Sequence, residues 1–250
     1  MGGPLDGKVA LVTGAGKNIG RAIALSLAAD GARVIVNGRL DTAAIDAVVG
    51  EIRAAGGEAM AVLADVSKPE DVKKMVADGV ARFGGLDIVV SNAGLRRQTA
   101  FLDIQLEEWR EILSVALDGA FILAQATVPH LIARGGGRIV ALSGISNHIG
   151  TANRCHVSAS KAGLEGLMRA LAVELAPSGI TCNCVSPGAI DTLRGASAGA
   201  RPGTLTDQGI PAGRKGNVDE IAGLVRHLVG PLGGYITGQT LHVNGGAYLT

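Results

Sequence analysis

The chain has 250 residues, 47% of them hydrophobic, and a formal net charge of +1 at pH 7. This near-neutral balance, without a dominant basic patch, argues against a nucleic acid or a membrane surface as a partner. The length suits one α/β domain, and the 2% aromatic content implies a core built from Ala, Val, Leu and Ile.

Strand-like apolar runs alternate with helix-like segments along the whole chain. Strands are predicted from residue 9 and at residues 33–37, 58–63, 86–90, 138–142, 180–185 and 239–243. Helices are predicted from residue 21 and at residues 42–55, 69–83, 106–133, 154–176 and 218–229. With right-handed crossovers, this order predicts an α/β fold, a single Rossmann-type doubly wound parallel seven-stranded sheet with helices on both faces.

The elements follow one another without a linker or an internal repeat, so residues 1–250 are expected to form one dinucleotide-binding domain. Residues 187–217 are rich in Gly, Ala, Ser, Thr and Pro and have no clear periodicity. A loop of that length in a compact domain is usually functional, and we expect a substrate lid at about 187–217.

The cysteines and the apolar segments indicate the cellular compartment of the protein. Cys155, Cys182 and Cys184 cannot all pair within one chain, and their spacing suits neither a zinc site nor a disulfide framework. Cys182 and Cys184 share one face of a strand and are interpreted as packing residues, with redox activity as the alternative. The apolar stretch 119–133 is shorter than the ~20 residues of a membrane span, and the first residues lack a signal-peptide pattern. We expect a cytoplasmic protein without a metal site.

A glycine-rich turn joins the first strand to the first helix. Gly14 permits the turn, Gly16 lets a ligand approach the backbone, and Gly20 lets the helix lie near the strand. The free amides and the positive dipole end of the helix N-terminus suit a diphosphate. A tight turn that binds nothing is the alternative, but the strand–turn–helix context favours dinucleotide binding.

The second strand indicates which dinucleotide is bound. In such folds an acid at the end of this strand accepts the ribose hydroxyl of NAD, whereas a basic residue accommodates the 2′-phosphate of NADP. Here the strand ends Val36-Asn37-Gly38-Arg39, and Lys17 in the glycine-rich turn adds a second cation. The sequence therefore favours NADP(H) over NAD(H). Solvated surface charges are the alternative, because Asp41 also lies near.

Residues 13–20 resemble the Thr-Gly-x-x-x-Gly-x-Gly fingerprint of the short-chain dehydrogenase/reductase family, with Asn18 in place of the middle glycine. Asn tolerates a positive φ, so the turn is expected to be preserved. Further matches follow in order: Asp65-Val66, Asn92-Ala93-Gly94, Pro187-Gly188-Ala-Ile-Asp-Thr192 and the C-terminal strand within 236–246. The resemblance covers essentially the whole chain and implies a classical family member. The cofactor-binding residues that the turn, the second strand and these matches predict are Gly14, Gly16, Lys17, Asn18, Ile19, Gly20, Arg39, Asp65, Val66, Asn92, Ala93, Gly94, Lys161, Pro187, Gly188, Ile190 and Thr192.

The same resemblance exposes a departure at the catalytic positions. The family uses a Tyr, a Lys four residues later, a Ser thirteen residues before the Tyr, and an Asn on the preceding helix. Here Lys161 is present, but Val157 stands at the Tyr position and Ala116 at the Asn position. Gly144 stands at the Ser position, with Ser143 beside it. The sequence therefore predicts a degenerate catalytic tetrad.

Other side chains could replace the missing acid/base. His148, after the fifth strand, could face the crevice and act with Lys161 as a catalytic residue, against the alternative of a solvated loop histidine. Asn153 or Arg154 could share the helix face of Val157. Ser158 and Lys161 match an acyl-transfer motif only superficially, since its companion motifs are missing.

Three functions stay open. The first is an NADP(H)-dependent oxidoreductase that acts on a carbonyl or alcohol of a small-molecule substrate with altered acid/base residues. The second is a redox-silent NADP-binding protein, and the third is a lyase or isomerase on the same fold. We rank the first ahead because the residues expected near the nicotinamide are in place. The resemblance also implies a homotetramer, in which helices 106–133 and 154–176 pack against a partner subunit.

Overall fold

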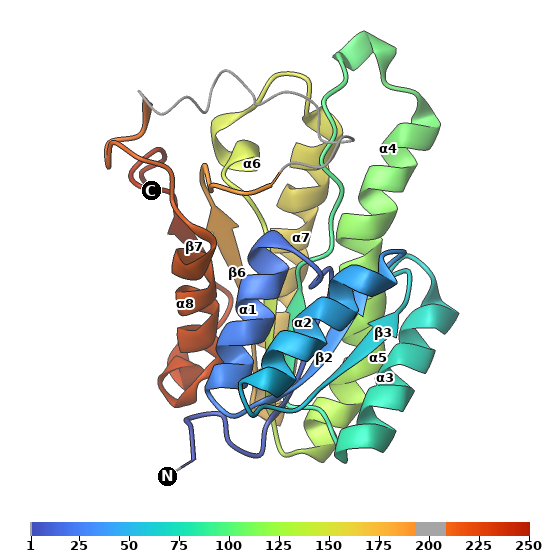
Figure 1. Cartoon of the computed structure of the whole chain (residues 1–250). Helices are drawn as coiled ribbons and strands as arrows, with labels where there is room; N and C mark the ends of the chain where they lie inside the picture. Colours follow the sequence, from blue (N-terminus) through green and yellow to red (C-terminus); the bar gives the residue numbers. More distant parts are fainter. Residues whose placement is uncertain (1, 194–208) are drawn as a thin grey trace.

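Seven parallel strands form one sheet in a computed structural model that describes residues 2–193 and 209–250. The strand order is β3-β2-β1-β4-β5-β6-β7 (Figure 1). The strands are β1 (Val9–Val12), β2 (Arg33–Gly38), β3 (Ala59–Leu63), β4 (Ile88–Ser91), β5 (Gly137–Leu142), β6 (Ile180–Pro187) and β7 (Thr240–Val243). The predicted fold class is confirmed.

The helices agree closely with the predicted segments, except that a short helix at Ser146–Ile149 was not predicted and the predicted helix 106–133 is divided in two. They are α1 (Asn18–Ala29), α2 (Thr42–Ala54), α3 (Pro69–Phe83), α4 (Leu106–Leu113), α5 (Gly119–Ala133), α6 (Ser146–Ile149), α7 (Cys155–Leu175) and α8 (Val218–Val229). Short 3₁₀ turns lie at Phe101–Asp103 (η1), Ala176–Ser178 (η3) and Pro231–Tyr235 (η7).

The sheet is buried on both faces because each face has its own layer of helices. Ala10 and Val12 of β1 pack in a cluster with α1, α2 and α8, whereas Val9 and Leu11 pack in a second cluster with α3, α5 and α7. Alternate residues of a strand point to opposite faces, so a strand covered twice must be apolar throughout. This explains the unbroken apolar run that marks β1 in the sequence.

The predicted helix 106–133 is interrupted near its middle. Ser114–Asp118 (η2) form a π-helical segment between α4 and α5. The combined helical segment of 28 residues contains an 18-residue window of mean hydropathy 1.6, of which 44% is buried inside the fold. By length and composition alone it could span a membrane, yet it packs against α3, α7, β4 and β5. Its apolar character is explained by a place in the core layer.

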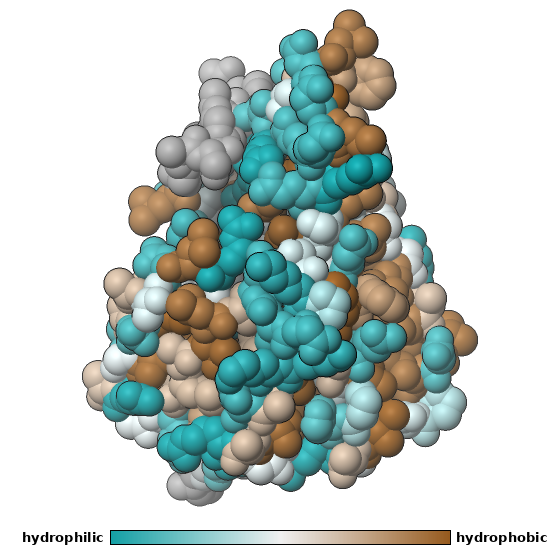
Figure 2. Space-filling view, turned by 90° about the vertical axis from the view of Figure 1, so that its right-hand side faces the viewer, coloured by the Kyte–Doolittle hydropathy of each residue, from teal (hydrophilic) through white to brown (hydrophobic). Residues whose placement is uncertain are grey.

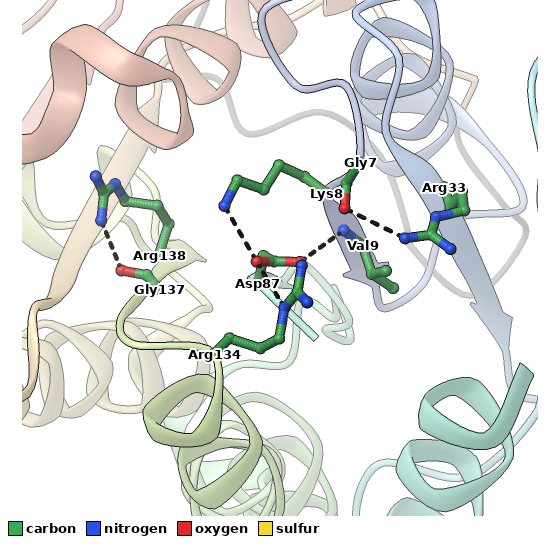
Figure 3. Close-up of polar contacts among 8 residues, drawn as sticks. All are labelled: Gly7, Lys8, Val9, Arg33, Asp87, Arg134, Gly137 and Arg138. Atoms are coloured by element: carbon green, nitrogen blue, oxygen red, sulfur yellow. Dashed lines mark hydrogen bonds and ion pairs between the residues drawn. The ribbon is translucent and has the colours of Figure 1, made fainter. Parts of the chain in front are cut away.

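The buried carboxylate of Asp87, directly before β4, links residues near the amino ends of the strands (Figure 3). Asp87 accepts hydrogen bonds from Lys8 Nζ at 3.2 Å, the Val9 amide at 3.0 Å and Arg134 Nε at 3.2 Å. Only 4% of Asp87 is exposed, so these donors are needed to compensate for its burial. The opposite edge of the sheet, at the carboxyl ends of the strands, is free of this clamp and carries the cavity.

Cys182 and Cys184 lie in the second core cluster, both almost fully buried. Burial raises the pKa of each thiol to about 12. A thiol that stays protonated at neutral pH is a poor nucleophile, which supports the packing interpretation over redox activity.

Candidate active site

A cavity of about 530 Å³ opens at the carboxyl ends of the strands. All the residues predicted to bind the cofactor line it, from Gly14 in the turn after β1 to Thr192 after β6. Apart from Lys161 on α7, they come from the carboxyl ends of five strands, which the parallel topology brings to one edge. Of the predicted lid, Leu193 and Lys215 also line the cavity, whereas residues 194–208 lie outside the described residues.

The glycine-rich turn has the backbone that its residues predict. Gly14 has φ of 61° and Asn18 has φ of 51°, so the expectation that Asn18 preserves the turn is confirmed. A Cβ on Gly20 would lie 2.4 Å from the Gly14 carbonyl O, which no side chain tolerates. The Asn18 side chain also donates to the Leu193 carbonyl O and accepts from the Leu193 amide, both at 2.9 Å. A glycine at this position could form neither bond.

The Asn92-Ala93-Gly94 segment holds the turn in place from the neighbouring strand. Asn92 Nδ2 donates to the carbonyl O atoms of Thr13 and Gly14 at 2.9 and 3.0 Å. The amides of Asn92 and Ala93 both donate to Thr13 Oγ1. These bonds satisfy backbone groups that the turn leaves without partners, and they fix the floor of the cavity.

Two exposed cations lie at the end of the cavity formed by β2 and β3. Lys17 and Arg39 line the wall, and the Asp41 carboxylate accepts the Ala44 amide at 3.0 Å as the N-cap of α2. Burial alone would raise the pKa of Asp65, but hydrogen bonds from Ser67 and the charge of Arg39 outweigh it and lower the pKa. Arg39 is therefore close enough to this wall to act on a charge there.

Lys161 projects from α7 into the opposite end of the cavity. Its Nζ donates to the Leu142 carbonyl O at 2.5 Å, and a Cβ on Gly94 would lie 3.6 Å from it. Burial, followed by the positive charge of Arg96, lowers the pKa of Lys161 to about 8. Val157 and Gly144 line the same cavity. Among its described lining residues there is no Tyr, His or Cys.

Behind this wall, a buried carboxylate collects three hydrogen bonds. Glu165 Oε1 accepts from Ser143 Oγ at 2.5 Å and Asn147 Nδ2 at 3.0 Å, and lies 2.9 Å from His148 Nε2. Burial would raise the pKa of Glu165, but these bonds outweigh it and lower the pKa. The His148 ring also packs against His242 and Tyr248, with centroids 4.7 and 5.1 Å away. His148 is thus directed to Glu165 and is absent from the described cavity wall.

Comparisons with known proteins agree with this architecture. A family model described as enoyl-(acyl carrier protein) reductase matches residues 14–248. The 3-oxoacyl-(acyl-carrier-protein) reductase of Synechocystis sp. is 40% identical over 243 residues, which cover 97% of each chain. The corresponding reductase FabG of Escherichia coli is 38% identical over 246 residues, which cover 98% of each chain. A short-chain dehydrogenase from Burkholderia cenocepacia, solved in complex with NADP, superposes with a TM-score of 0.90 at 38% identity and covers 98% of this chain and 99% of that one.

The chain belongs to the short-chain dehydrogenase/reductase family. The names of the family model and of these two relatives refer to different bonds, a C=C and a C=O, so membership in this oxidoreductase family leaves the substrate open. Within this short-chain dehydrogenase/reductase fold, the Lys position is occupied by Lys161 on α7. Val157 lies one turn before it and Gly144 follows β5. Ala116 is 2% exposed in the π-helical segment.

Sequence reasoning missed two groups at this site, Glu165 and Arg96, and named a third, Arg154, only as a side chain that could share a face with Val157. Glu165 follows Lys161 by four residues, and this i,i+4 spacing on a helix was the available signal. Arg96 and Arg154 both line the cavity. Ser158 Oγ contacts the Ser146 carbonyl O at 3.4 Å and does not line the described cavity, so nothing in the geometry favours the acyl-transfer motif.

Proposed function

We propose that this protein is an NADP(H)-dependent oxidoreductase that interconverts a carbonyl and an alcohol with Lys161 as the acid/base residue. The observation that carries the proposal is the position of Lys161 in a cavity that also contains every predicted cofactor-binding residue. The NADP of the Burkholderia cenocepacia relative and the two cations Lys17 and Arg39 support the choice of NADP(H).

The residues present fit such a cofactor. Gly14 and Gly20 leave the backbone open beside the N-terminus of α1, where a diphosphate accepts amide hydrogen bonds. Lys17 and Arg39 would hold the 2′-phosphate, since guanidinium and ammonium groups bind phosphate by charge-assisted hydrogen bonds. When bound, NADPH supplies the hydride that adds to the carbonyl carbon of the substrate.

Lys161 would supply the matching proton. Its ammonium donates a proton to the carbonyl oxygen while the hydride adds to carbon, which yields the alcohol and a neutral amine that takes a proton from water. The Leu142 carbonyl orients Nζ. With a pKa of about 8, the group is protonated at neutral pH and still a competent acid, because a catalytic pKa works best near the operating pH.

The geometry favours Lys161 over His148 for this step. His148 Nε2 lies 2.9 Å from Glu165 and His148 is absent from the described cavity wall, whereas Lys161 lines the cavity directly. The role of His148 stays a prediction that the same experiment tests. Replacing Lys161 by Met should abolish turnover, whereas His148→Gln should retain it. Loss of turnover in His148→Gln with Lys161→Met active would assign the step to His148.

The deciding experiment combines calorimetric NADPH titration with a spectrophotometric assay of NADPH oxidation over a panel of ketones, diketones and keto acids. Saturable binding together with oxidation that depends on Lys161 supports the proposal. Absence of heat with NADPH and with NADH on folded protein contradicts cofactor binding. Conversion of a substrate without a change in cofactor redox state would instead indicate a lyase or isomerase.

A redox-silent NADP-binding protein is the second proposal, and the nonpolar residues Val157, Gly144 and Ala116 favour it. An acid/base group contributes typically 10²–10⁴-fold to a rate, so its loss can leave binding without useful chemistry. NADPH binding without turnover of any panel member, followed by turnover after Val157→Tyr with Gly144→Ser, would support this function.

We further propose that the protein is a homo-oligomer, with the family's tetramer as the expected state. Phe121 on α5 and Val173 on α7 are 50% and 81% exposed, and Figure 2 shows hydrophobic side chains gathered at the top of the molecule and along one flank. Exposed apolar patches of this kind mark interaction surfaces. Light scattering after chromatography should give a mass above one chain, and Phe121→Glu should lower it.

A further inference from the structure

Ser143 lies in the cavity wall with its hydroxyl group bound by a carboxylate behind that wall. The residue lines the cavity and is 9% exposed, and its Oγ donates to Glu165 Oε1 at 2.5 Å. Glu165 is buried and does not line the described cavity. Because an ionised carboxylate has no proton to give, the hydrogen in this bond belongs to Ser143 and points to Glu165.

Two further side chains keep Glu165 ionised. Asn147 Nδ2 donates to the same Oε1 atom at 3.0 Å, and His148 Nε2 lies 2.9 Å from it. Burial alone would raise the pKa of Glu165, but the bonds from Ser143, Asn147 and His148 outweigh it and lower the pKa. The carboxylate therefore stays an acceptor at neutral pH, and the orientation of the Ser143 hydroxyl group is fixed.

This orientation decides what Ser143 can offer to a ligand. A hydroxyl group has one hydrogen to donate and two lone pairs that accept. Since the hydrogen is committed to Glu165, a ligand in the cavity can use Ser143 only as an acceptor. The bond to a negative charge strengthens that role, because linked hydrogen bonds polarise one another.

Lys161 places a donor next to this acceptor. Its Nζ donates to the Leu142 carbonyl O at 2.5 Å, and that carbonyl belongs to the peptide group that joins Leu142 to Ser143. Bond geometry therefore puts Nζ within about 5.5 Å of the Ser143 Cα. An ammonium group has three hydrogens and accepts none, so Lys161 can also donate to a ligand. The wall thus presents a donor and an acceptor side by side.

We propose that the substrate is an α-hydroxyketone whose carbonyl oxygen accepts a hydrogen bond from Lys161 while its hydroxyl group donates one to Ser143. This inference rests on the proposed function and names its substrate class. The hydride of NADPH adds to the carbonyl carbon and the proton of Lys161 to the carbonyl oxygen, which gives a vicinal diol; the hydroxyl group at Ser143 is unchanged. Ser143 then determines specificity, and Glu165 is its positioning residue.

The test compares three small ketones that differ at one group. Hydroxyacetone carries the hydroxyl group, 2-butanone has nearly the same shape with a methyl group in its place, and methoxyacetone keeps the oxygen but has no hydrogen to donate. Each is assayed for NADPH oxidation and titrated, with ligand-observed NMR, into the protein saturated with NADP⁺. Hydroxyacetone should exceed the other two in kcat/KM by roughly 10–100-fold, because they leave the acceptor at Ser143 without a partner.

Variants separate this contact from the intrinsic reactivity of the ketones. Ser143→Ala should lower kcat/KM for hydroxyacetone by roughly 3–10-fold, the usual net value of one hydrogen bond, and leave 2-butanone unchanged. Ser158→Ala is the matched control, because Ser158 lies outside the described cavity wall.

A second pair of variants tests the role of Glu165. In Glu165→Gln the amide group can donate to Ser143 Oγ and free its hydrogen, so the preference for hydroxyacetone over methoxyacetone should shrink or reverse. A residue that only supports the fold would change both rates alike. Glu174→Gln is the control, because Glu174 is exposed on the same helix.

The outcomes separate this inference from the proposed function. Reduction of all three ketones without preference for hydroxyacetone would overturn the inference and leave the oxidoreductase intact. Binding of hydroxyacetone to the NADP⁺-loaded protein, weakened by Ser143→Ala, would support the inference even without turnover. If hydroxyacetone neither binds nor reacts, or if Ser143→Ala and Ser158→Ala act alike, the inference is wrong.

Discussion

Replacing Lys161 by Met should make the fold more stable while it removes the proposed acid. The fold lowers the pKa of Lys161 from its ordinary 10.5 to about 8, and one pKa unit corresponds to about 1.4 kcal/mol. Holding the ammonium in the native state therefore costs about 3 kcal/mol. Met avoids that cost but loses the hydrogen bond to the Leu142 carbonyl O, about 1 kcal/mol. The free energy of unfolding at pH 7 should rise by about 2 kcal/mol.

The pH dependence gives the sign of this effect. Between pH 8 and 10.5 the unfolded chain holds the Lys161 proton and the native state releases it. The cost is therefore fully present below pH 8, falls as the pH rises from 8 to 10.5, and is gone above 10.5. The difference between the variant and the parent protein should shrink across that window.

Urea denaturation of both proteins at several pH values measures this difference. Lys73→Met is the control, because Lys73 pairs with Glu70 on the surface of α3 and its side chain is 65% exposed. Its unfolding free energy should change by less than about 1 kcal/mol. The reasoning is refuted if Lys161→Met is less stable than the parent at pH 7, or if its advantage stays constant up to pH 10.5.

Three further outcomes are expected. The rate of carbonyl reduction should be constant below pH 8 and fall about tenfold per pH unit above it, since Lys161 must carry its proton; a profile flat to pH 10 would contradict this. Arg39→Asp should weaken NADPH binding by roughly 10–100-fold in calorimetry without weakening NADH binding, and equal losses for both would argue against a phosphate contact. Val157→Tyr with Gly144→Ser should raise ketone reduction by about 10²–10⁴-fold, whereas Val157→Phe with Gly144→Ser, which adds bulk without a hydroxyl, should not.

The sheet and its cofactor wall could be predicted because their signals are local. The β1 strand, the Gly14–Gly20 turn and the start of α1 are read from consecutive residues, and parallel topology then brings the strand ends together. The positive φ of Asn18 followed from the chemistry of one residue. The domain boundaries and the role of each site residue stay predictions.

The contacts of Glu165 behind the cavity wall could not be predicted from the sequence because they join distant parts of the chain. Ser143 and Glu165 are 22 residues apart and meet only once α7 packs beneath β5. The sequence places His148 near the crevice, but the four-residue helix α6, which has no periodic signal, turns it to Glu165. The partners of a side chain that sits in a loop depend on packing, which spacing alone does not encode.

The π-helical segment Ser114–Asp118 has a consequence for α4. A π turn accommodates one more residue than an α turn, and one residue corresponds to about 100° of rotation around a helix. The π turn thereby rotates α4 about its own axis relative to α5. In this orientation Glu108 contacts His156, whose side chain is fully buried. Deleting one residue from the segment would turn Glu108 away from α7, and the buried imidazole of His156 would lose its carboxylate partner. The π turn thus sets which face α4 presents to α7, independently of the face that α5 presents to the sheet.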